Sequence, residues 1–236
     1  MELKVLDMVF PRRCPVCDDA VSEVGSLICA GCADDFTLID EPYCIKCGRP
    51  VADDSLCYCP ECDRNGSNYD YVRGRAVYEY DEVLKDSIYR FKYGGRREYA
   101  QYYAKVMADR LGKLIKSWEP EAFIPVPVHK SRMRKRGYNQ ASLLADALGK
   151  LLDIPVEDIL ERTEKTKLQK GLTADERQNN LKKALKIRSN DVKLKKVVLV
   201  DDIYTTGSTI NAAASCLRNA GVSYVYYAAV GAAVID

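Results

Sequence analysis

Long apolar runs are missing from this sequence. No stretch approaches the roughly 20 consecutive apolar residues that span a bilayer, and the first residues, from Met1 to Pro11, are too acidic and too short for a secretory signal peptide. We therefore expect a cytoplasmic protein without membrane insertion. With 236 residues, 47% of them hydrophobic, the chain can build one large domain or two modest ones around a real core.

The chain also has little histidine and a small net charge. His129 is the only histidine, and because a lone histidine at a strand end is usually a polar residue with local partners, we assign it no catalytic role. The net charge of +2 hides an asymmetry: residues 1–70 hold 6 Lys and Arg against 14 Asp and Glu, and residues 71–236 hold 30 against 20. The basic second part fits a polyphosphate or a nucleic acid strand, although a solvated surface has the same composition.

Cysteine, by contrast, is abundant and regularly spaced. Nine of the ten cysteines precede residue 63, and eight of them form two units of the pattern C-x2-C-x11-C-x2-C, offset by thirty residues. The units are Cys14, Cys17, Cys29 and Cys32, then Cys44, Cys47, Cys59 and Cys62. This spacing is typical of structural zinc sites. We predict two Zn2+ ions, each held by four thiolates, in an acidic segment that needs them to fold.

Other interpretations of the cysteines stay open. A disulfide framework is disfavoured because nothing indicates secretion. Cys57 forms a C-x-C with Cys59 and could replace it, the ligands of the two units could interleave, and one unit could lack its metal. Turn-forming residues at 64–68 predict a boundary, so we expect a zinc-binding module over residues 1–68 and a second domain over residues 69–236.

The most informative stretch of the second domain is residues 197–209. Four apolar residues predict a strand buried on both faces, and two carboxylates follow it, Asp201 and Asp202. A hydroxyl-rich turn then leads into a helix and consists of Thr205, Thr206, Gly207, Ser208 and Thr209.

Such a turn favours a phosphate, because it presents successive N–H groups at the positive end of the helix. It lacks the lysine of a Walker loop and the G-x-G-x-x-G spacing of a dinucleotide site. Carboxylates accept hydrogen bonds from vicinal hydroxyls, so the acidic pair predicts a sugar phosphate. An ordinary strand followed by a capped turn is the structural alternative.

A second informative stretch lies at residues 129–140, between a strand predicted over 121–128 and a helix predicted over 139–152. It packs five cations into seven residues, among them Lys130, Arg132, Arg134 and Arg136. By composition it fits a nucleic-acid patch, a pyrophosphate clamp or a solvated loop. Its place at the carboxyl end of a strand favours a ligand.

The rest of the second domain follows an α/β pattern. Further predicted elements are strands at 71–80 and 224–230 and helices at 81–91 and 97–117. Strands separated by helices predict a mainly parallel sheet with its ligand at the carboxyl ends of the strands. The basic break at 92–97 fits a ligand contact as well as a solvated helix end, and Cys216 is interpreted as a core thiol.

These motifs resemble two known patterns. The stretch 197–209 resembles the signature with which type I phosphoribosyltransferases hold 5-phosphoribosyl-1-pyrophosphate (PRPP). Nearly the whole chain is similar to the ComF/ComFC family of competence-associated proteins. The motifs that carry this similarity are FPRRCPVC at 10–17, PVPV at 125–128 followed by RGYNQ at 136–140, and the acidic loop at 201–209.

The resemblance implies a type I phosphoribosyltransferase-like α/β fold, a parallel sheet flanked by helices, behind a small four-cysteine zinc-ribbon module. It implies that Asp201 and Asp202 contact the ribose and that the loop 205–209 holds the 5-phosphate. Mg2+ and the cations of 130–136 would hold the leaving pyrophosphate.

The polar segment 162–173 predicts a mobile loop, and Thr173 fits the N-cap of a following helix. The resemblance makes 169–172 and 177–181 a closing loop, with Leu168 where relatives commonly have proline.

In function, the resemblance implies pentosyl transfer from PRPP and a link to DNA uptake or natural transformation, beside a DNA translocase or helicase. No general base for an acceptor is evident in the sequence. Two alternatives therefore stand: a regulator that binds PRPP without turnover, and an accessory protein that binds single-stranded DNA. The aromatic stacking partners for such DNA would be Tyr93, Tyr138 and Tyr204, although tyrosine is abundant in this chain and a structural role is the alternative.

Overall fold

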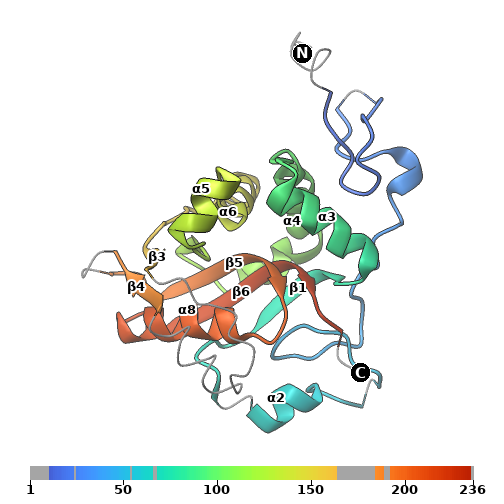
Figure 1. The fold of residues 1–236 in the computed structure, drawn as a ribbon. Coiled ribbons are helices and arrows are strands. Elements are labelled where there is room, and N and C mark those ends of the chain that lie inside the picture. The colour runs from blue at the N-terminus through green and yellow to red at the C-terminus, as the bar shows by residue number, and fades with distance from the viewer. Residues whose placement is uncertain are drawn as a thin grey trace, which may run out of the picture.

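A four-stranded parallel sheet forms the centre of the molecule (Figure 1). The computed structural model describes residues 11–23, 25–53, 55–65, 68–163, 184–188 and 192–234. The strands follow the order β1-β6-β5-β2, and their bounds are β1 Gly74–Glu79, β2 Ala122–Pro125, β5 Lys196–Tyr204 and β6 Tyr224–Ala232. All neighbouring strands are parallel, which confirms the predicted sheet.

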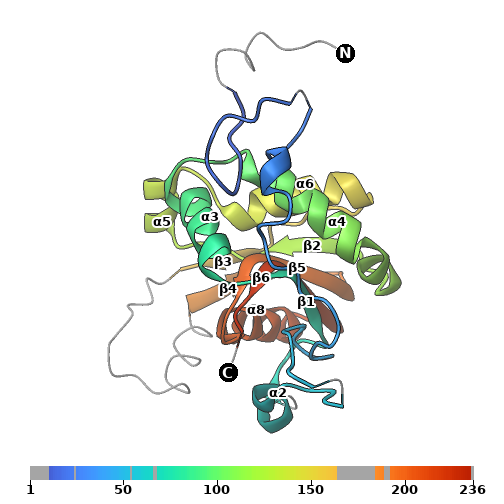
Figure 2. The same cartoon turned by 90° about the vertical axis from the view of Figure 1, so that its right-hand side faces the viewer.

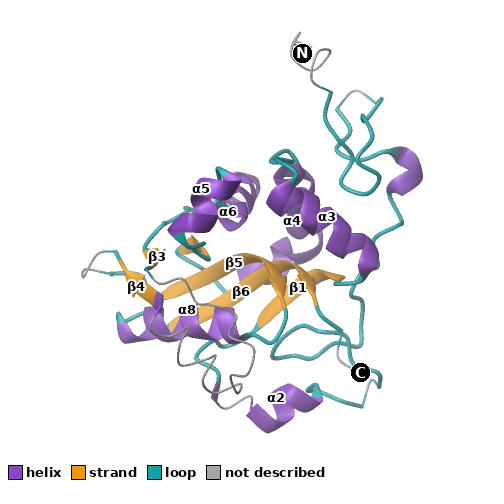
Figure 3. Cartoon of the chain, in the orientation of Figure 1, coloured by secondary structure: helices purple, strands orange, loops and turns teal. Residues whose placement is uncertain are grey.

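Helices cover both faces of the sheet, as Figures 2 and 3 show. One face carries α3 (Glu82–Tyr93), α4 (Tyr99–Ser117), the short α5 (Lys130–Arg136) and α6 (Gln140–Leu152), and the other carries α8 (Ser208–Asn219). The alternation of β5 explains the two layers: Val198 and Val200 join the core under α4 and α6, whereas Val197 and Leu199 join the core that includes α8. Within the described ranges, no helix combines the length and apolar character needed to cross a membrane.

The two cysteine units lie on opposite sides of the sheet (Figure 2). The first includes a 3-10 turn, η1 (Ala30–Cys32), and contacts α3 and α4: Arg90 donates to the Pro15 carbonyl at 3.1 Å, and the Tyr99 hydroxyl donates to Asp18 at 2.7 Å. The second unit runs into α2 (Pro60–Asn65), and its four cysteines belong to the same buried cluster as Leu199. The second unit is thus part of the core on the α8 side.

Several elements differ from the sequence prediction. Residues 130–136 form a helix instead of a loop, because His129 accepts a hydrogen bond from the Ser131 N–H at 3.1 Å and Gly137, at φ 78°, ends the turn. An unpredicted two-stranded antiparallel sheet joins β3 (Leu160–Arg162) and β4 (Leu185–Ile187). The predicted closing loop at 169–172 and 177–181, and the helix capped by Thr173, lie outside the described residues.

Candidate functional site

The acidic pair lies at the carboxyl end of β5, the central strand next to β2. Asp201 and Asp202 are 7% and 3% exposed. Asp202 accepts a hydrogen bond from the Gln140 side chain at 3.1 Å and forms an ion pair with the ammonium of Lys92. Its own backbone N–H donates to Asp201 Oδ1 at 2.9 Å. Segments far apart in the sequence therefore meet at this pair.

The two carboxyl groups have opposite pKa shifts. Burial and the neighbouring Asp202 carboxylate raise the pKa of Asp201 well above its ordinary value. Burial also acts to raise the pKa of Asp202, but the ammonium of Lys92, together with the hydrogen bonds of Asp201 and Gln140, lowers this pKa overall. Burial lowers the pKa of Lys92, and Asp202 reverses that effect so that the net pKa is raised. The pair thus favours one negative charge on Asp202, balanced by Lys92.

The predicted phosphate loop follows β5 directly and ends at the start of α8. Gly207 has φ 73°, and a Cβ atom at this position would collide with the Tyr204 hydroxyl. Thr206 Oγ1 lies 2.8 Å from Ser208 Oγ and caps the Ser208 N–H at 3.4 Å. The sequence needs glycine here because the chain turns in a left-handed conformation while passing close to a buried ring. The loop brings the N-terminus of a twelve-residue helix to the edge of the sheet.

The acidic pair, the phosphate loop and a group of cations line one pocket of about 230 Å³. Of the four cations proposed from sequence, Arg132 and Arg136 line it, and Lys130 and Arg134 are not among its lining residues. The helical form of α5 explains the division: residues 132 and 136 share one face, whereas 130 and 134 are turned from it by about 200°. Of the loop, Thr205 and Thr209 are lining residues.

Among the lining residues that were not assigned to the site from the sequence are Lys92, Gln140 and Arg162, which carry a charge or an amide. Lys92 lies in the basic break whose role the sequence left open, and Gln140 ends the RGYNQ motif. Both therefore belong to sequence features that could have identified them as site residues. Arg162 belongs to the unpredicted strand β3, and no sequence feature marked it as a site residue. Burial, and then the charge of Arg132, lower the pKa of Arg162, which places it in a crowded cationic part of the pocket.

The aromatic residues considered for DNA stacking separate into two groups. Tyr138 and Tyr204 are only 5% and 1% exposed, and their hydroxyls bond to the Phe91 carbonyl and to Tyr71. Their assignment as stacking partners was therefore wrong, because the core covers their rings. Tyr93 is 51% exposed and lies beside the pocket, with the Arg136 guanidinium 4.8 Å from its ring centroid.

The second cysteine unit has the geometry of a tetrahedral metal site. All four of its thiols are buried and lie within 4.8 Å of one another, and the Sγ atoms of Cys47 and Cys59 are 3.6 Å apart. A zinc ion with Zn–S bonds near 2.3 Å places its sulfurs about 3.8 Å apart, so the thiols fit zinc. Cys57 is exposed and lies outside the group.

The first unit is similar but more open. The thiols of Cys14, Cys17 and Cys32 lie within 4.8 Å of one another, and Cys29 Sγ lies 4.0 Å from Cys17 Sγ. Each group draws its cysteines from one unit, so the units do not interleave. The thiol chemistry and these distances suit zinc in both places.

Comparison with known proteins finds two family models, which match separate parts of the chain. A family model described as "Double zinc ribbon domain" matches residues 5–63, and one described as "Phosphoribosyl transferase domain" matches residues 134–235. Competence protein F of Haemophilus influenzae is 34% identical over 222 residues, which cover 92% of this chain and 95% of that protein. Competence protein ComFC of Streptococcus pneumoniae is 30% identical, with 85% of each chain covered.

A third relative, DNA utilization protein YhgH of Escherichia coli, is 29% identical over 222 residues, with 92% of this chain and 96% of that protein covered. These relatives span both the cysteine units and the sheet. The family resemblance inferred from the sequence motifs is confirmed, and the chain belongs to the ComF/ComFC family, with a double zinc ribbon followed by a phosphoribosyltransferase-like domain.

Proposed function

We propose that this protein binds PRPP together with Mg2+ and acts in the uptake or use of DNA. The observation that carries the PRPP proposal is that a helix N-terminal loop, an acidic pair and two arginines line the same pocket. Each part suits one portion of the ligand: the loop suits the 5-phosphate, the carboxylates suit the ribose hydroxyls, and the arginines suit the pyrophosphate.

The chemistry that we infer is displacement of pyrophosphate by a nucleophilic acceptor at the anomeric carbon of the ribose, so that the bond from the acceptor to this carbon forms as the bond to pyrophosphate breaks. Arg132 and Arg136 would stabilise the charge that gathers on the leaving pyrophosphate, and Mg2+ bound with the ligand would add to that stabilisation. Asp202, kept ionised by Lys92, would hold the ribose so that the bond to pyrophosphate points toward the arginines. Pyrophosphate release would mark a transferase, and binding without release would mark a PRPP-sensing regulator.

Calorimetry tests the binding proposal. Asp201→Asn combined with Asp202→Asn should abolish PRPP binding in the presence of Mg2+, because an amide oxygen accepts hydrogen bonds from the ribose hydroxyls more weakly than a carboxylate does and supplies no negative charge for the metal. Asp109→Asn is the matched control, since Asp109 is exposed and, within the described part of the chain, its ion pair is with Lys105 on α4. An affinity for PRPP that is the same in the double variant as in the wild type would refute the proposal.

We also infer contact with single-stranded DNA, at an exposed tyrosine pair. The names of the relatives concern competence and DNA utilization, and a DNA translocase or helicase fits that setting. Tyr89 and Tyr93 are 65% and 51% exposed, their ring centroids lie 5.1 Å apart, and Arg136 adjoins Tyr93. Exposed rings beside arginines suit bases and phosphates.

Oligonucleotide titration at several salt concentrations tests this inference. Each base that stacks on an aromatic ring contributes about 1–3 kcal/mol, so Tyr89→Ser with Tyr93→Ser should weaken binding at least about fivefold. Tyr224→Ser is the control, because Tyr224 is 49% exposed at the start of β6, the end of the strand away from the pocket. Equal affinities for the double variant and the control would argue against a stacking site on α3.

For the cysteine units, we infer two structural Zn2+ ions per chain within a module of residues 1–68. The saturated thiol sets leave no open position on the metal, so the ions would serve folding and not catalysis. The second unit shares its core with the sheet, and for this reason its metal should stabilise both parts of the protein.

A further inference from the structure

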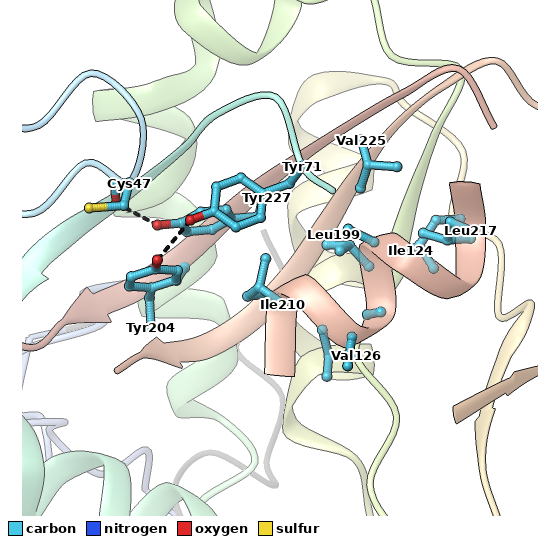
Figure 4. Close-up of a cluster of buried hydrophobic side chains, with 14 of the residues drawn as sticks. Cys47, Tyr71, Ile124, Val126, Leu199, Tyr204, Ile210, Leu217, Val225 and Tyr227 are labelled. Atoms are coloured by element: carbon cyan, nitrogen blue, oxygen red, sulfur yellow. Dashed lines mark hydrogen bonds between the residues drawn. The ribbon is translucent and has the colours of Figure 1, made fainter. Parts of the chain in front are cut away.

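A line of aromatic contacts connects the second cysteine unit to the phosphate loop (Figure 4). The Tyr227 hydroxyl donates a hydrogen bond to the backbone carbonyl of Cys47, a member of the metal-ligand group. The Tyr227 ring stacks on Tyr204, with centroids 4.7 Å apart and planes at 4°. The Tyr204 hydroxyl lies directly against the backbone of Gly207, where no Cβ atom fits. Two rings therefore separate a metal ligand from the loop.

Arg49 makes a second contact from the same unit to Tyr204. Its guanidinium carbon lies 4.9 Å from the Tyr204 ring centroid, and its side chain is 2% exposed. Glu61 holds it through an ion pair of 2.6 Å. Arg49 follows Cys47 by two residues and Glu61 lies between Cys59 and Cys62, so both partners of this buried pair depend on the arrangement of the thiols.

A third connection reaches the first turn of α8. The backbone N–H of Asp70, just after the second unit, donates to the side chain of Asn211 at 2.7 Å. Asn211 is fully buried, and its own N–H donates to the Gly207 carbonyl at 2.7 Å. Tyr71, the next residue along, bonds to the Tyr204 hydroxyl at 2.8 Å. Residues just after the second unit therefore contact the chain on both sides of the phosphate loop, at Tyr204 before it and at Asn211 after it.

We propose that the second cysteine unit, when it holds its metal, positions the phosphate loop, so that zinc occupancy there sets the affinity for a phosphate-bearing ligand. Tyr227, Tyr204 and Arg49 are the positioning residues. The ligand named in this proposal rests on the proposed function. The first unit contacts α3 and α4 through Asp18 and the Pro15 carbonyl, and its occupancy leaves the loop unaffected.

The coupling must be reciprocal. If zinc in the second unit favours ligand binding, the bound ligand raises the affinity of that unit for zinc by the same free energy. Ribose 5-phosphate is a suitable probe, because it carries the 5-phosphate and the ribose but no pyrophosphate for the arginines. A chelator that extracts zinc from the full chain then reports on the coupling from the metal side.

A conservative variant tests the contact on the full-length zinc-loaded protein. Tyr227→Phe removes only the hydroxyl that donates to Cys47, and loss of one such hydrogen bond corresponds to roughly a fivefold change. We expect hydrogen exchange of the amides in residues 205–211 to become roughly fivefold faster and ribose 5-phosphate to bind roughly fivefold more weakly. Tyr102→Phe is the control: its hydroxyl bonds to Tyr78 at 3.0 Å and is buried under α4, far from the loop.

Loss of either metal site gives the second test. Cys62→Ser is expected to accelerate exchange in residues 205–211, whereas Cys32→Ser leaves it as in the wild type. In Cys32→Ser, saturating ribose 5-phosphate should raise the zinc affinity of the remaining second site, as measured by competition with a chelator at equilibrium; in Cys62→Ser it should not raise the zinc affinity of the first site. If Cys62→Ser fails to fold, the Tyr227→Phe comparison decides the matter.

The outcomes separate this proposal from the proposed function. Loop exchange in Tyr227→Phe that matches both the wild type and Tyr102→Phe would overturn the coupling, even if PRPP binds. A wild-type protein that binds neither PRPP nor ribose 5-phosphate would overturn the proposed function, and the exchange comparison would still decide whether the second unit positions the loop.

Discussion

Replacing Lys92 by methionine should destabilise the protein in a pH-dependent way. The Lys92 side chain is 22% exposed and pairs with the buried Asp202, which adjoins Asp201. Removing one partner of a buried ion pair costs about 3–5 kcal/mol, and the partial exposure of Lys92 places the expected loss near the lower end, at about 3 kcal/mol at pH 8. The aliphatic part of methionine retains the packing, so the loss reflects the charge.

The sign of the pH dependence follows from the pKa shifts. In the wild type the folded pKa of Asp202 is lowered, so its contribution to stability is present above the unfolded pKa of about 3.9 and is lost as the pH falls through the folded pKa. The folded pKa of Lys92 is raised, so its contribution is present below about 10.4 and is lost as the pH rises through the folded pKa.

In Lys92→Met, Asp202 loses its counter-charge and its folded pKa rises with burial. The folded variant then binds a proton that the unfolded chain does not. The stability deficit of the variant should therefore shrink by about 1.4 kcal/mol for each pH unit below the new pKa of Asp202.

Urea unfolding at fixed free zinc, from pH 8 to pH 5, measures this deficit. Lys92→Arg retains the charge and should lose much less stability. Lys105→Met breaks an exposed pair with Asp109, at 3.0 Å on α4, and should cost no more than about 0.5 kcal/mol. A deficit for Lys92→Met that stays constant over this range, or that equals the deficit of Lys105→Met, would refute the assignment of Asp202 as a carboxylate held ionised by Lys92.

Three further predictions concern the loop, the cations and the metal. Gly207→Ala should lower the free energy of unfolding by about 1–3 kcal/mol, because backbone strain adds to the collision of the new methyl group; thermal melts with unchanged midpoints would contradict this. Arg132→Ala with Arg136→Ala should weaken PRPP more than ribose 5-phosphate in calorimetry, whereas Arg134→Ala on the opposite face of α5 should weaken neither. Native mass spectrometry should find about two Zn2+ per chain, and Cys57→Ser should retain both; a lost ion would make Cys57 a ligand.

Local patterns in the sequence were sufficient for the elements that hold the site. The run VVLV and the apolar period after Thr209 identified β5 and α8, because a buried strand and a helix leave different periodicities over a few residues. The same holds for the cysteine repeat, whose spacing depends on the geometry of one metal. These features are encoded within short segments and need no knowledge of the fold.

Contacts between distant segments could not be derived in this way. Lys92 reaches Asp202 across 110 positions of the chain, and only the packing of α3 on the sheet brings them together. Arg132 and Arg134 looked equivalent in the sequence until α5 turned one toward the pocket and the other away. The exposure of Tyr93 and the burial of Tyr204 have the same origin, since the number of neighbours depends on tertiary packing.

The two cysteine units show how one repeated motif acquires two docking modes. The residues after their first knuckles, Asp18 and Gly48, both have positive φ, at 62° and 65°. At Gly48 a Cβ atom would come within 2.7 Å of the Gly74 carbonyl, so close approach to β1 requires glycine. At Asp18 the left-handed turn is kept, and the side chain instead receives hydrogen bonds from Arg96 and Tyr99.

The residue that follows each of these two positions also differs between the units. Arg49 is buried against Tyr204, whereas Asp19, thirty residues earlier, is exposed. The metal chemistry of the repeat constrains only the thiols and the turn between them, which leaves these neighbouring positions available for contacts with the sheet or with the helices. Gly48→Asp should therefore displace the second unit from β1 while the unit retains its zinc. The zinc content would then stay as in the wild type, whereas amide hydrogen exchange in the phosphate loop would become faster.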